Sequence, residues 1–450
     1  MIKLATQFVC QQCGAVYRKW AGKCDNCGAW NSLVEQASSE NGKSAVARSR
    51  GKKLVVETLQ NVTIDSVKNR LVSGFSEIDA VLGGGFMPAG VTLIAGQPGI
   101  GKSTLLLQIA AHIATQKSVL YISGEESAGQ IKLRAERLGA KHQQNLHLVS
   151  STSADDIATT ISDSDYDLVI VDSVQTLSLA EITSAPGSVS QITNASNVII
   201  RAAKKSHTSV VLVGHVTKEG SIAGPKVLEH LVDVVLNFEG DRYGGFKMVR
   251  AIKNRYGSTS EVALLEMREE GLCQVDNPSA ALLEERQDTD GSVILATLEG
   301  NRPLLVEIQA LVNPTHFGYP KRTASGFDIN RLNVLIAVIE KRTKLKLSDS
   351  DIYINVVGGL KINDAAADLA VAMAIASAAA GRKLKKGTVV FGEIGLGGEI
   401  RSARMSEKRL AEAEKLGFTR ALTPHLRSRS SIAVQVTDLR SALIDYLNKN

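Results

Sequence analysis

The sequence has few aromatic residues, no long apolar run and no leader pattern. Aromatic residues make up 4% of its 450 residues, which argues against an aromatic-rich recognition module of the lectin or antibody type. The most apolar stretch, residues 365–380, carries Asp368 and is short for a bilayer span, so we expect a buried helix there. The first residues lack the basic start, apolar core and cleavage site of a secretory signal. These absences predict a cytoplasmic protein without a membrane segment.

The composition that is present is typical of a globular chain with several domains. Hydrophobic residues make up 44% and charged residues 22%, and 450 residues exceed what one hydrophobic core usually organises. The formal net charge is +6, and residues 1–60 hold nine Lys and Arg against four Asp and Glu. This local basic excess fits either contact with phosphates or a solvated linker.

Four of the five cysteines form two C-x2-C pairs near the N-terminus, at Cys10, Cys13, Cys24 and Cys27. Two tight turns that each present two thiolates predict a tetrahedral zinc site, and four protein ligands leave no open position for catalysis. A module this small has little core, so we expect Zn²⁺ to supply its folding energy. Disulfides are disfavoured in a cytoplasmic chain. The remaining Cys273 is expected in the core.

Changes in composition divide the chain into a zinc module at 1–35, a flexible basic linker at 36–60, and two larger domains. In residues 61–276, β-branched runs alternate with helical patterns, which predicts an α/β domain with a mostly parallel sheet. Residues 285–450 mix Gly-punctuated strands with helices, which predicts an α+β domain. The expected strands are 91–95, 119–123, 168–172, 210–214, 232–238, 304–312, 352–357 and 389–394, and the expected helices are 104–116, 330–341, 365–380 and 406–416.

A phosphate-binding loop follows the first of these strands. The segment matches the pattern G-x4-G-K-[ST] between an apolar strand and an apolar helix, which is the context the motif requires. Its backbone N–H groups and the helix N-terminus would hold phosphates, Lys102 would place a cation on them, and Ser103 would bind Mg²⁺. The expected nucleotide-binding residues here are Gly96, Gln97, Pro98, Gly99, Ile100, Gly101, Lys102, Ser103 and Thr104.

Acidic residues end two neighbouring strands. Asp172 closes the apolar run 168–172 and is expected on the metal side, as in a Walker B element. Glu125 and Glu126 follow the run 119–123, where an acid would position or activate the attacking water. We predict Glu125 rather than Glu126 in that role.

Three features of the sequence belong together: the zinc module, the phrase Gly-Gly-Gly-Phe-Met-Pro-Ala-Gly at 83–90, and Lys-Asn-Arg-Tyr-Gly at 253–257. With them, the sequence resembles the bacterial RadA/Sms DNA-repair family over essentially the whole chain. The resemblance implies a RecA-like P-loop ATPase core of the DnaB type. It implies that His215 senses the γ-phosphate, and that Lys253 and Arg255, on a basic turn, reach the nucleotide of an adjacent subunit.

The same resemblance implies two DNA-binding loops, at 181–190 and 217–226. Such loops hold single-stranded DNA by its backbone, and Lys218 and Lys226 are the expected contacts. Neither loop offers an aromatic platform, so we expect weak sequence preference.

The last domain resembles the proteolytic domain of Lon, through residues 364–368 and 391–400. The likeness puts Ala366 at the position of the serine nucleophile and Glu407 at that of the lysine base, with Lys408 displaced by one residue. A Ser-Lys dyad needs both side chains, so we predict a scaffold without proteolytic activity. Basic residues of this domain either touch duplex DNA or form a solvated surface.

The full interpretation is a homo-oligomeric ring, hexameric by family likeness, that uses ATP, Mg²⁺ and Zn²⁺. It would bind single-stranded DNA and branched recombination intermediates, drive branch migration, and cooperate with the RecA recombinase. Alternatives are an ATP-dependent Lon-type protease, a zinc-dependent adaptor that loads recombinase without a motor, and an ATPase that regulates a protein partner.

Overall fold

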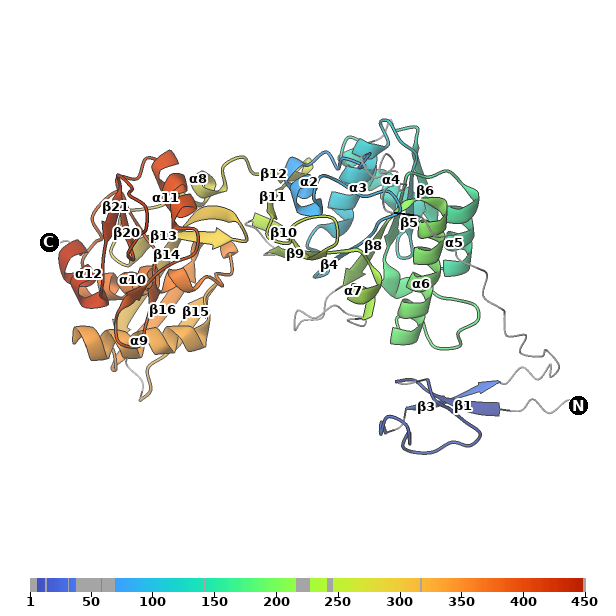
Figure 1. Ribbon diagram of the computed structural model, residues 1–450, viewed down its shortest axis with the longest axis horizontal. Coiled ribbons are helices and arrows are strands. Elements are labelled where there is room, and N and C mark those ends of the chain that lie inside the picture. The colour runs from blue at the N-terminus through green and yellow to red at the C-terminus, as the bar shows by residue number, and fades with distance from the viewer. Residues whose placement is uncertain are drawn as a thin grey trace, which may run out of the picture.

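Figure 1 shows a computed structural model with three folded parts in chain order: a small N-terminal sheet, an α/β domain and an α+β domain. Cys13, Lys218 and Lys226 lie outside the residues that the structure describes. The described residues are 6–12, 14–30, 32–37, 58, 69–140, 143–215, 227–240, 246–315 and 318–447.

The α/β domain is built on a nine-stranded sheet in the order β12-β11-β10-β9-β4-β8-β7-β5-β6. The six strands from β9 to β6 are parallel, as the alternation of strands and helices predicted. Most of these strands are short apolar runs buried on both faces, which is typical of a parallel sheet between helical layers. They are β4 (Val91–Gly96), β5 (Val119–Ser123), β6 (Leu146–Ser150), β7 (Leu168–Asp172), β8 (Ser209–His215) and β9 (Val234–Gly240).

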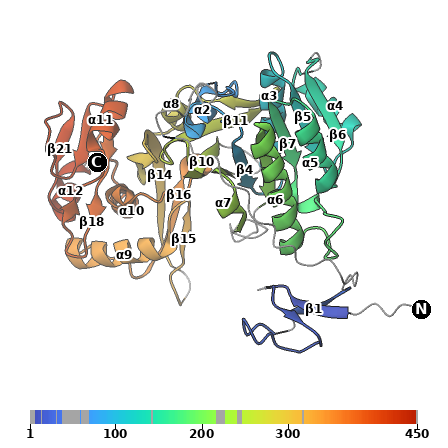
Figure 2. The ribbon, with the colours of Figure 1, turned by 45° about the vertical axis from the view of Figure 1, so that its right-hand side comes forward.

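Helices cover both faces of this sheet (Figure 2). On one face, α2 (Ser76–Leu82), α3 (Lys102–Ile113) and α4 (Ala128–Arg137) share a hydrophobic cluster with the sheet. On the other face, α5 (Ala154–Asp163), α6 (Val189–Ser206) and α7 (Val227–Leu231) do so. Ser127, Ser153 and Ser188 cap the N-termini of α4, α5 and α6, because their hydroxyls accept backbone N–H bonds that a first helical turn leaves open.

The antiparallel edge of the sheet was not predicted from the sequence. It comprises β10 (Phe246–Asn254), β11 (Val262–Arg268) and β12 (Gly271–Gln274). The expectation that Lys253 lies on a turn is wrong, because Lys253 pairs with Val235 within the β9–β10 ladder. The pairing of β10 with β9 shifts by one residue between Ala251 and Lys253, and β10 ends at Asn254. Of the two basic residues, Arg255 alone lies in the bend that follows the strand.

The α+β domain has a seven-stranded mixed sheet in the order β15-β16-β14-β13-β17-β20-β21. The expected strand 389–394 divides in two, because Phe391 and Gly392 belong to neither β17 nor β18, and the N–H of Gly392 donates to the Ala366 carbonyl instead. Its strands are β13 (Ser292–Glu299), β14 (Arg302–Pro314), β15 (Arg322–Ser325), β16 (Ser350–Val356), β17 (Thr388–Val390), β20 (Arg420–Thr423) and β21 (Ala433–Gln435), with β18 (Glu393–Ile394) and β19 (Ile400–Arg401) forming a separate pair.

A buried apolar helix lies at the centre of the α+β domain. α10 (Asp368–Ala380) is buried from Asp368 to Ser377, as predicted, although residues 365–367 form a separate 3-10 turn before it. It packs on β13 and β14 and contacts α9 (Ile329–Thr343) and α12 (Leu439–Tyr446), while α8 (Pro278–Leu283) and α11 (Ser406–Lys415) also contact the sheet. Among the described helices, none is both long and apolar enough to cross a bilayer.

The turn between β13 and β14 joins the two larger domains. Asn301 donates its backbone N–H to Ser260 at 2.7 Å, and the Arg302 guanidinium contacts the Glu77 carboxylate at 2.5 Å. Glu299 accepts a bond from Arg250 at 3.3 Å. The two domains are therefore joined by ion pairs and a backbone bond as well as by the connecting chain.

The N-terminal part is a three-stranded antiparallel sheet in the order β2-β1-β3. It contains β1 (Thr6–Cys10), β2 (Val16–Tyr17) and β3 (Leu33–Ala37). Its buried cluster holds only Cys10, Cys24 and Leu33 among the described residues. A core of this size is too small to stabilise a fold on its own, which is why zinc was expected to contribute.

Candidate nucleotide site and zinc module

Glycines shape the loop between β4 and α3. A Cβ on Gly96 would stand 2.6 Å from the Phe238 carbonyl oxygen, so the close approach of β4 to β9 permits only glycine there. Gly101 has φ 115°, in the left-handed region that favours glycine. Lys102 follows at once as the first residue of α3. The loop thus delivers backbone N–H groups and a helix N-terminus to one place, which is a fit for a polyphosphate.

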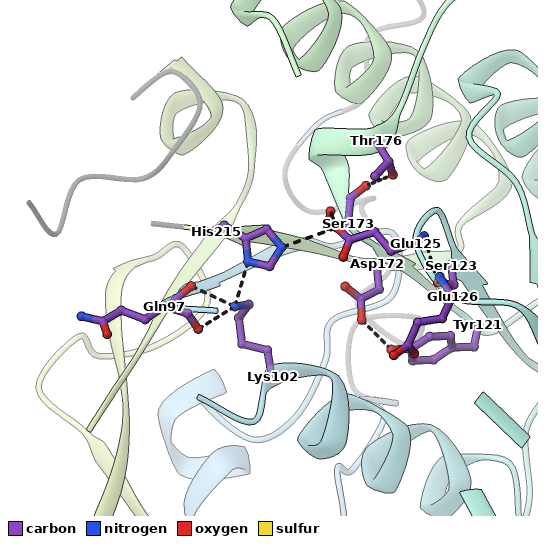
Figure 3. A network of polar contacts seen from close by, with 11 residues as sticks. Gln97, Lys102, Tyr121, Ser123, Glu125, Glu126, Asp172, Ser173, Thr176 and His215 are labelled. Atoms are coloured by element: carbon purple, nitrogen blue, oxygen red, sulfur yellow. Dashed lines mark hydrogen bonds and ion pairs between the residues drawn. The ribbon is translucent and has the colours of Figure 1, made fainter. Parts of the chain in front are cut away.

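The Lys102 ammonium lies at the centre of a polar network (Figure 3). Its Nζ donates to the carbonyl oxygens of Gly96 at 2.8 Å and Gln97 at 3.1 Å, and lies 3.2 Å from His215 Nδ1. Burial lowers the pKa of Lys102 to about 8, and the carboxylates of Asp172 and Glu125 oppose that shift. A cation that is held in the loop but only weakly solvated is suited to bind phosphate oxygens.

Glu125 and His215 meet at the carboxyl edge of the sheet. His215 ends β8, and its Nε2 lies 3.6 Å from Glu125 Oε1. The same Glu125 oxygen accepts a bond from the Ser173 hydroxyl at 2.7 Å. His215 therefore contacts Lys102 through one ring nitrogen and Glu125 through the other (Figure 3).

The two neighbouring acids have different environments. Glu126 forms an ion pair with Arg134 of α4, whereas the Glu125 side chain is 50% exposed and turned toward His215. Asp172, at the end of β7, accepts a bond from the Tyr121 hydroxyl at 2.8 Å. Burial, and then the nearby Asp172 charge, raises the pKa of Tyr121 well above 10, so it acts as a hydrogen-bond donor.

The remaining loop positions fit a nucleotide with its metal. Gln97, Pro98 and Gly99 are exposed, and a Cβ on Gly99 would meet nothing within 4 Å. Ser103 and Thr104 are half-buried in the first turn of α3. When Mg²⁺ is bound, its ligands would be hydroxyl and carboxylate oxygens, which Ser103 and Asp172 supply.

Lys253 and Arg255 lie toward the amino ends of the parallel strands, away from the loop at their carboxyl ends. Lys253 pairs with Val235, which pairs in turn with Leu93, three residues before the end of β4. At about 3.3 Å per residue, Lys253 is about 10 Å back along the strands from the loop, and Arg255 is farther still. By this register, both residues lie away from the phosphate-binding loop of their own chain.

The contacts of these two basic residues also differ. Lys253 Nζ donates to the carbonyl oxygens of Val232 at 2.7 Å and Glu229 at 2.8 Å, so it caps the end of α7. Partial burial, and then the nearby Arg255 charge, lowers the pKa of Lys253. Arg255 contacts Asp233 at 3.5 Å with its side chain 59% exposed, which leaves its guanidinium open to a neighbour.

The cysteine side chains of the N-terminal sheet converge. The sulfur atoms of Cys10, Cys24 and Cys27 lie within 4.8 Å of one another, and those of Cys10 and Cys27 are 3.6 Å apart. A tetrahedron with Zn–S bonds of about 2.3 Å places sulfurs about 3.8 Å apart, so the three described cysteines fit zinc. Cys13 is outside the described residues, and its ligand role stays a prediction.

Several contacts at the site were missed from the sequence. No sequence motif indicated that the Ser173 hydroxyl donates to Glu125 or that the Tyr121 hydroxyl donates to Asp172. Both donors are polar residues within or next to apolar strands. The core position expected for Cys273 is wrong: its side chain is half-buried and its sulfur lies 3.7 Å from a Glu270 oxygen. The edge strand β12 presents Cys273 toward this charged turn rather than into the core.

In the α+β domain, the positions matched to the serine and the lysine of the Lon dyad carry other side chains. Ala366 is buried, Glu407 accepts a bond from Ser428 at the surface, and Lys408 donates to the Asn301 carbonyl at 3.3 Å. Arg409 is one of the buried residues of α11, and its guanidinium binds the Asp364 carboxylate at 2.6 Å. A guanidinium stays protonated at any physiological pH and cannot act as a base.

Family models match three parts of the chain. Residues 59–221 match an AAA domain, residues 8–35 match a rubredoxin metal binding domain, and residues 330–426 match the ChlI subunit of Mg-chelatase. A crystal structure of the RadB recombinase gives a partial match, at 21% identity and TM-score 0.37 over 46% of this chain and 100% of that one.

Relatives match nearly the whole chain. The DNA repair protein RadA of Bacillus subtilis (strain 168) is 47% identical over 434 residues, covering 94% of this chain and 93% of the relative. The DNA repair protein RadA of Brucella abortus (strain 2308) is 46% identical over 435 residues, with the same coverage of each.

A P-loop on a parallel sheet, with β8 between the loop strand and the strand that ends in Asp172, defines an ATPase of the RecA-like class. A zinc ribbon precedes this ATPase and an α+β domain follows it. The chain belongs to the family of the DNA repair protein RadA.

Proposed function

We propose that this protein is a ring-forming motor that binds single-stranded DNA and uses ATP hydrolysis to drive branch migration of recombination intermediates. The names of its relatives support a role in DNA repair. In this proposal, a homo-hexamer with Mg²⁺ at each nucleotide and Zn²⁺ in each N-terminal module acts on DNA that carries the RecA recombinase.

One observation carries the proposal: His215 contacts both the cation and the candidate base of the nucleotide site. Its ring lies 3.2 Å from Lys102 and 3.6 Å from Glu125. Loss of the γ-phosphate would change the charge beside Lys102, and the ring would respond. The segment that carries Lys218 and Lys226 follows His215 directly in the sequence. A γ-phosphate signal therefore has a short covalent path to the proposed DNA contacts.

The amino ends of the parallel strands support hydrolysis between subunits. Arg255 is too far from its own loop to stabilise charge on the nucleotide, yet it is exposed beside Asp233. An arginine supplied by a neighbour would stabilise the charge that develops at the γ-phosphate. Such a site needs a ring or filament, because each nucleotide lies between two subunits.

The α+β domain supports a scaffold role rather than proteolysis. Ala366 offers no nucleophile, and the buried charged residue of α11 is Arg409, which pairs with Asp364. In the competing proposal of an ATP-dependent protease, this domain would cleave an unfolded substrate such as casein with ATP present. We expect no cleavage above the rate of the Lys102→Ala variant.

The test is a strand-migration assay on a branched DNA substrate with a labelled strand, run with and without a recombinase. The proposal predicts ATP-dependent release of the labelled strand by the intact chain and none by Lys102→Ala. Migration that is equal in the two proteins would support a loading adaptor without a motor.

A further inference from the structure

The chain has only two tryptophans, Trp20 and Trp30, and both lie in the zinc module. Their exposed fractions are 59% and 73%, which is unusual for the largest apolar side chains. The buried cluster of the module is formed by Cys10, Cys24 and Leu33 and includes neither indole. The two rings are therefore not required to build the described part of the module.

The two indoles lie close together on one surface. The point where a Cβ would stand on Gly22 is 3.8 Å from Trp20 Cη2 and 4.0 Å from Trp30 Cζ3. Trp30 also forms an antiparallel bridge with Lys23, so the backbone on each side of the turn is fixed. Because Gly22 has no side chain, nothing from this residue fills the space between the rings.

The backbone under these rings is held by the metal-binding turn. Gly28 donates its N–H to the Cys24 carbonyl at 2.8 Å, and Cys24 donates to the Ala29 carbonyl at 2.9 Å. The Tyr17 hydroxyl accepts a bond from Asn26 N–H at 3.1 Å. A surface fixed in this way loses little conformational entropy when it binds a ligand.

Three exposed basic residues are close to the two indoles in the sequence, and one of them lies over an indole ring. Arg18, Lys19 and Lys23 are exposed, and Lys23 Nζ lies 5.6 Å from the Trp30 ring centre, in cation–π range. Asp25 is the one acid between residues 18 and 30. A zinc ion with four thiolates adds negative charge, but two of the three described sulfur-bearing residues, Cys10 and Cys24, are buried beneath the surface.

We propose that the surface formed by Arg18, Lys19, Trp20, Lys23 and Trp30 binds single-stranded DNA outside the ATPase ring, by stacking bases on the two indoles. Exposed aromatic faces flanked by cations match the alternation of bases and phosphates in a single strand. Purely phosphate-directed binding would not use the indoles, and a hydrophobic protein surface would not use three cations. The surface thus provides the aromatic platform that the loops at 181–190 and 217–226 do not contain.

Intrinsic tryptophan fluorescence of the intact chain tests this inference directly, because all of the signal comes from Trp20 and Trp30. Titration with an oligothymidylate at low salt should quench the emission. An abasic oligonucleotide of equal length has the same phosphates and no bases, so it should leave the emission nearly unchanged. Anisotropy of labelled DNA in the same samples reports binding by any part of the chain.

Variants separate stacking from other causes. Trp30→Ala should weaken oligothymidylate binding by about fivefold to tenfold, as expected for loss of one base stack, while Trp30→Phe should keep most of the affinity. Both variants change an exposed side chain, so neither should disturb folding.

Three results would overturn the inference: emission that stays constant when the DNA is fully bound, equal quenching by the abasic strand, or a response only to a recombinase filament. The last result would assign the surface to a protein partner. DNA-stimulated ATP hydrolysis, measured in the same samples, tests the proposed motor separately. The proposed motor and the proposed DNA-binding surface can therefore fail independently.

Discussion

Glu125 and Glu126 are adjacent in the sequence and differ in what they contact. Glu126 is paired with Arg134, and Glu125 shares its oxygen between Ser173 and His215. A carboxylate that is already neutralised by an arginine is a poor proton acceptor, so the partners assign the water-activating role to Glu125 in our proposal.

Substitution of each acid by glutamine gives a matched pair of variants. Glu125→Gln should lower the rate of ATP hydrolysis by about 100-fold or more while leaving nucleotide affinity nearly unchanged, as expected for loss of a general base. Glu126→Gln should stay within about threefold of the unaltered protein. Steady-state hydrolysis and binding of a fluorescent nucleotide measure both effects, and a larger loss in Glu126→Gln would reverse the assignment.

The pKa of Lys102 predicts a pH dependence of nucleotide binding. Burial lowers this pKa to about 8, so the ammonium loses its proton as the pH rises through that value. Affinity for ATP should fall above pH 8 by up to about tenfold per pH unit, because phosphate binds the protonated form. A titration of affinity from neutral to alkaline pH, with Lys102→Met as the pH-insensitive control, decides this; a flat profile for the unaltered protein would contradict it.

Motifs with fixed spacing allowed most site residues to be proposed from the sequence. The loop around Lys102, the acid Asp172 and the cysteine pairs each follow a pattern that their chemistry requires. The contacts of Tyr121 and Ser173 could not be predicted in this way, because they arise from parallel strands lying side by side. The contact of Cys273 with Glu270 depends on a short edge strand for the same reason.

At the scale of elements, the sequence predicted most of the buried parallel strands well and the edges poorly, and it did not predict the 18-residue helix α6. The runs at 119–123 and 168–172 match β5 and β7 in full, since their apolar residues are buried on both faces. β10 mixes buried and exposed positions and includes Lys247, Arg250 and Lys253. Its strand character comes from the neighbouring strands, which no local pattern reveals.

The junction between the two larger domains contains a buried acid with an unusual pKa. Glu299 is 5% exposed, at the end of β13. Burial raises its pKa to about 7, opposed by Arg250 and reinforced by the charges of Glu239 and Asp364. Because the folded pKa exceeds the unfolded value, protonation stabilises the fold. This stabilisation is fully present below about pH 4.5 and is lost as the pH rises through about 7.

The Glu299→Gln variant should remove this pH dependence. The free energy of unfolding of the unaltered protein should fall relative to that of the variant by about 2 kcal/mol between pH 5 and pH 8. Glu239→Gln, which removes the more exposed carboxylate near Arg250, is the matched control and should keep the dependence. Denaturant unfolding at both pH values measures the difference, and parallel curves for protein and variant would count against the assignment.

At the scale of the whole molecule, the account depends on assembly, because the two ends of the parallel strands carry different parts of one proposed site. The loop with Lys102 is at the carboxyl ends and Arg255 is beyond the amino ends. Within one chain, the register of β4, β9 and β10 keeps the two at opposite ends of these strands. A closed ring or a filament would place Arg255 of one subunit on the loop of the next.

Mixing two inactive variants tests shared sites. Lys102→Ala and Arg255→Ala should each lower hydrolysis by at least about 100-fold. Mixed subunits should recover part of the activity, because some interfaces then combine an intact Lys102 with an intact Arg255. Arg255 is preferred to Lys253 for this test, since Lys253 also caps α7. Absence of any recovery in subunits that are shown to co-assemble would argue against a site shared in trans.

The measurement that tests the central claim most directly is steady-state ATP hydrolysis by the full chain, with and without single-stranded DNA. The account predicts that DNA stimulates hydrolysis severalfold, that composition of the DNA matters little, and that Lys102→Ala abolishes the activity. Turnover that is the same with and without DNA would contradict a DNA-coupled motor and would indicate an ATPase that regulates a protein partner.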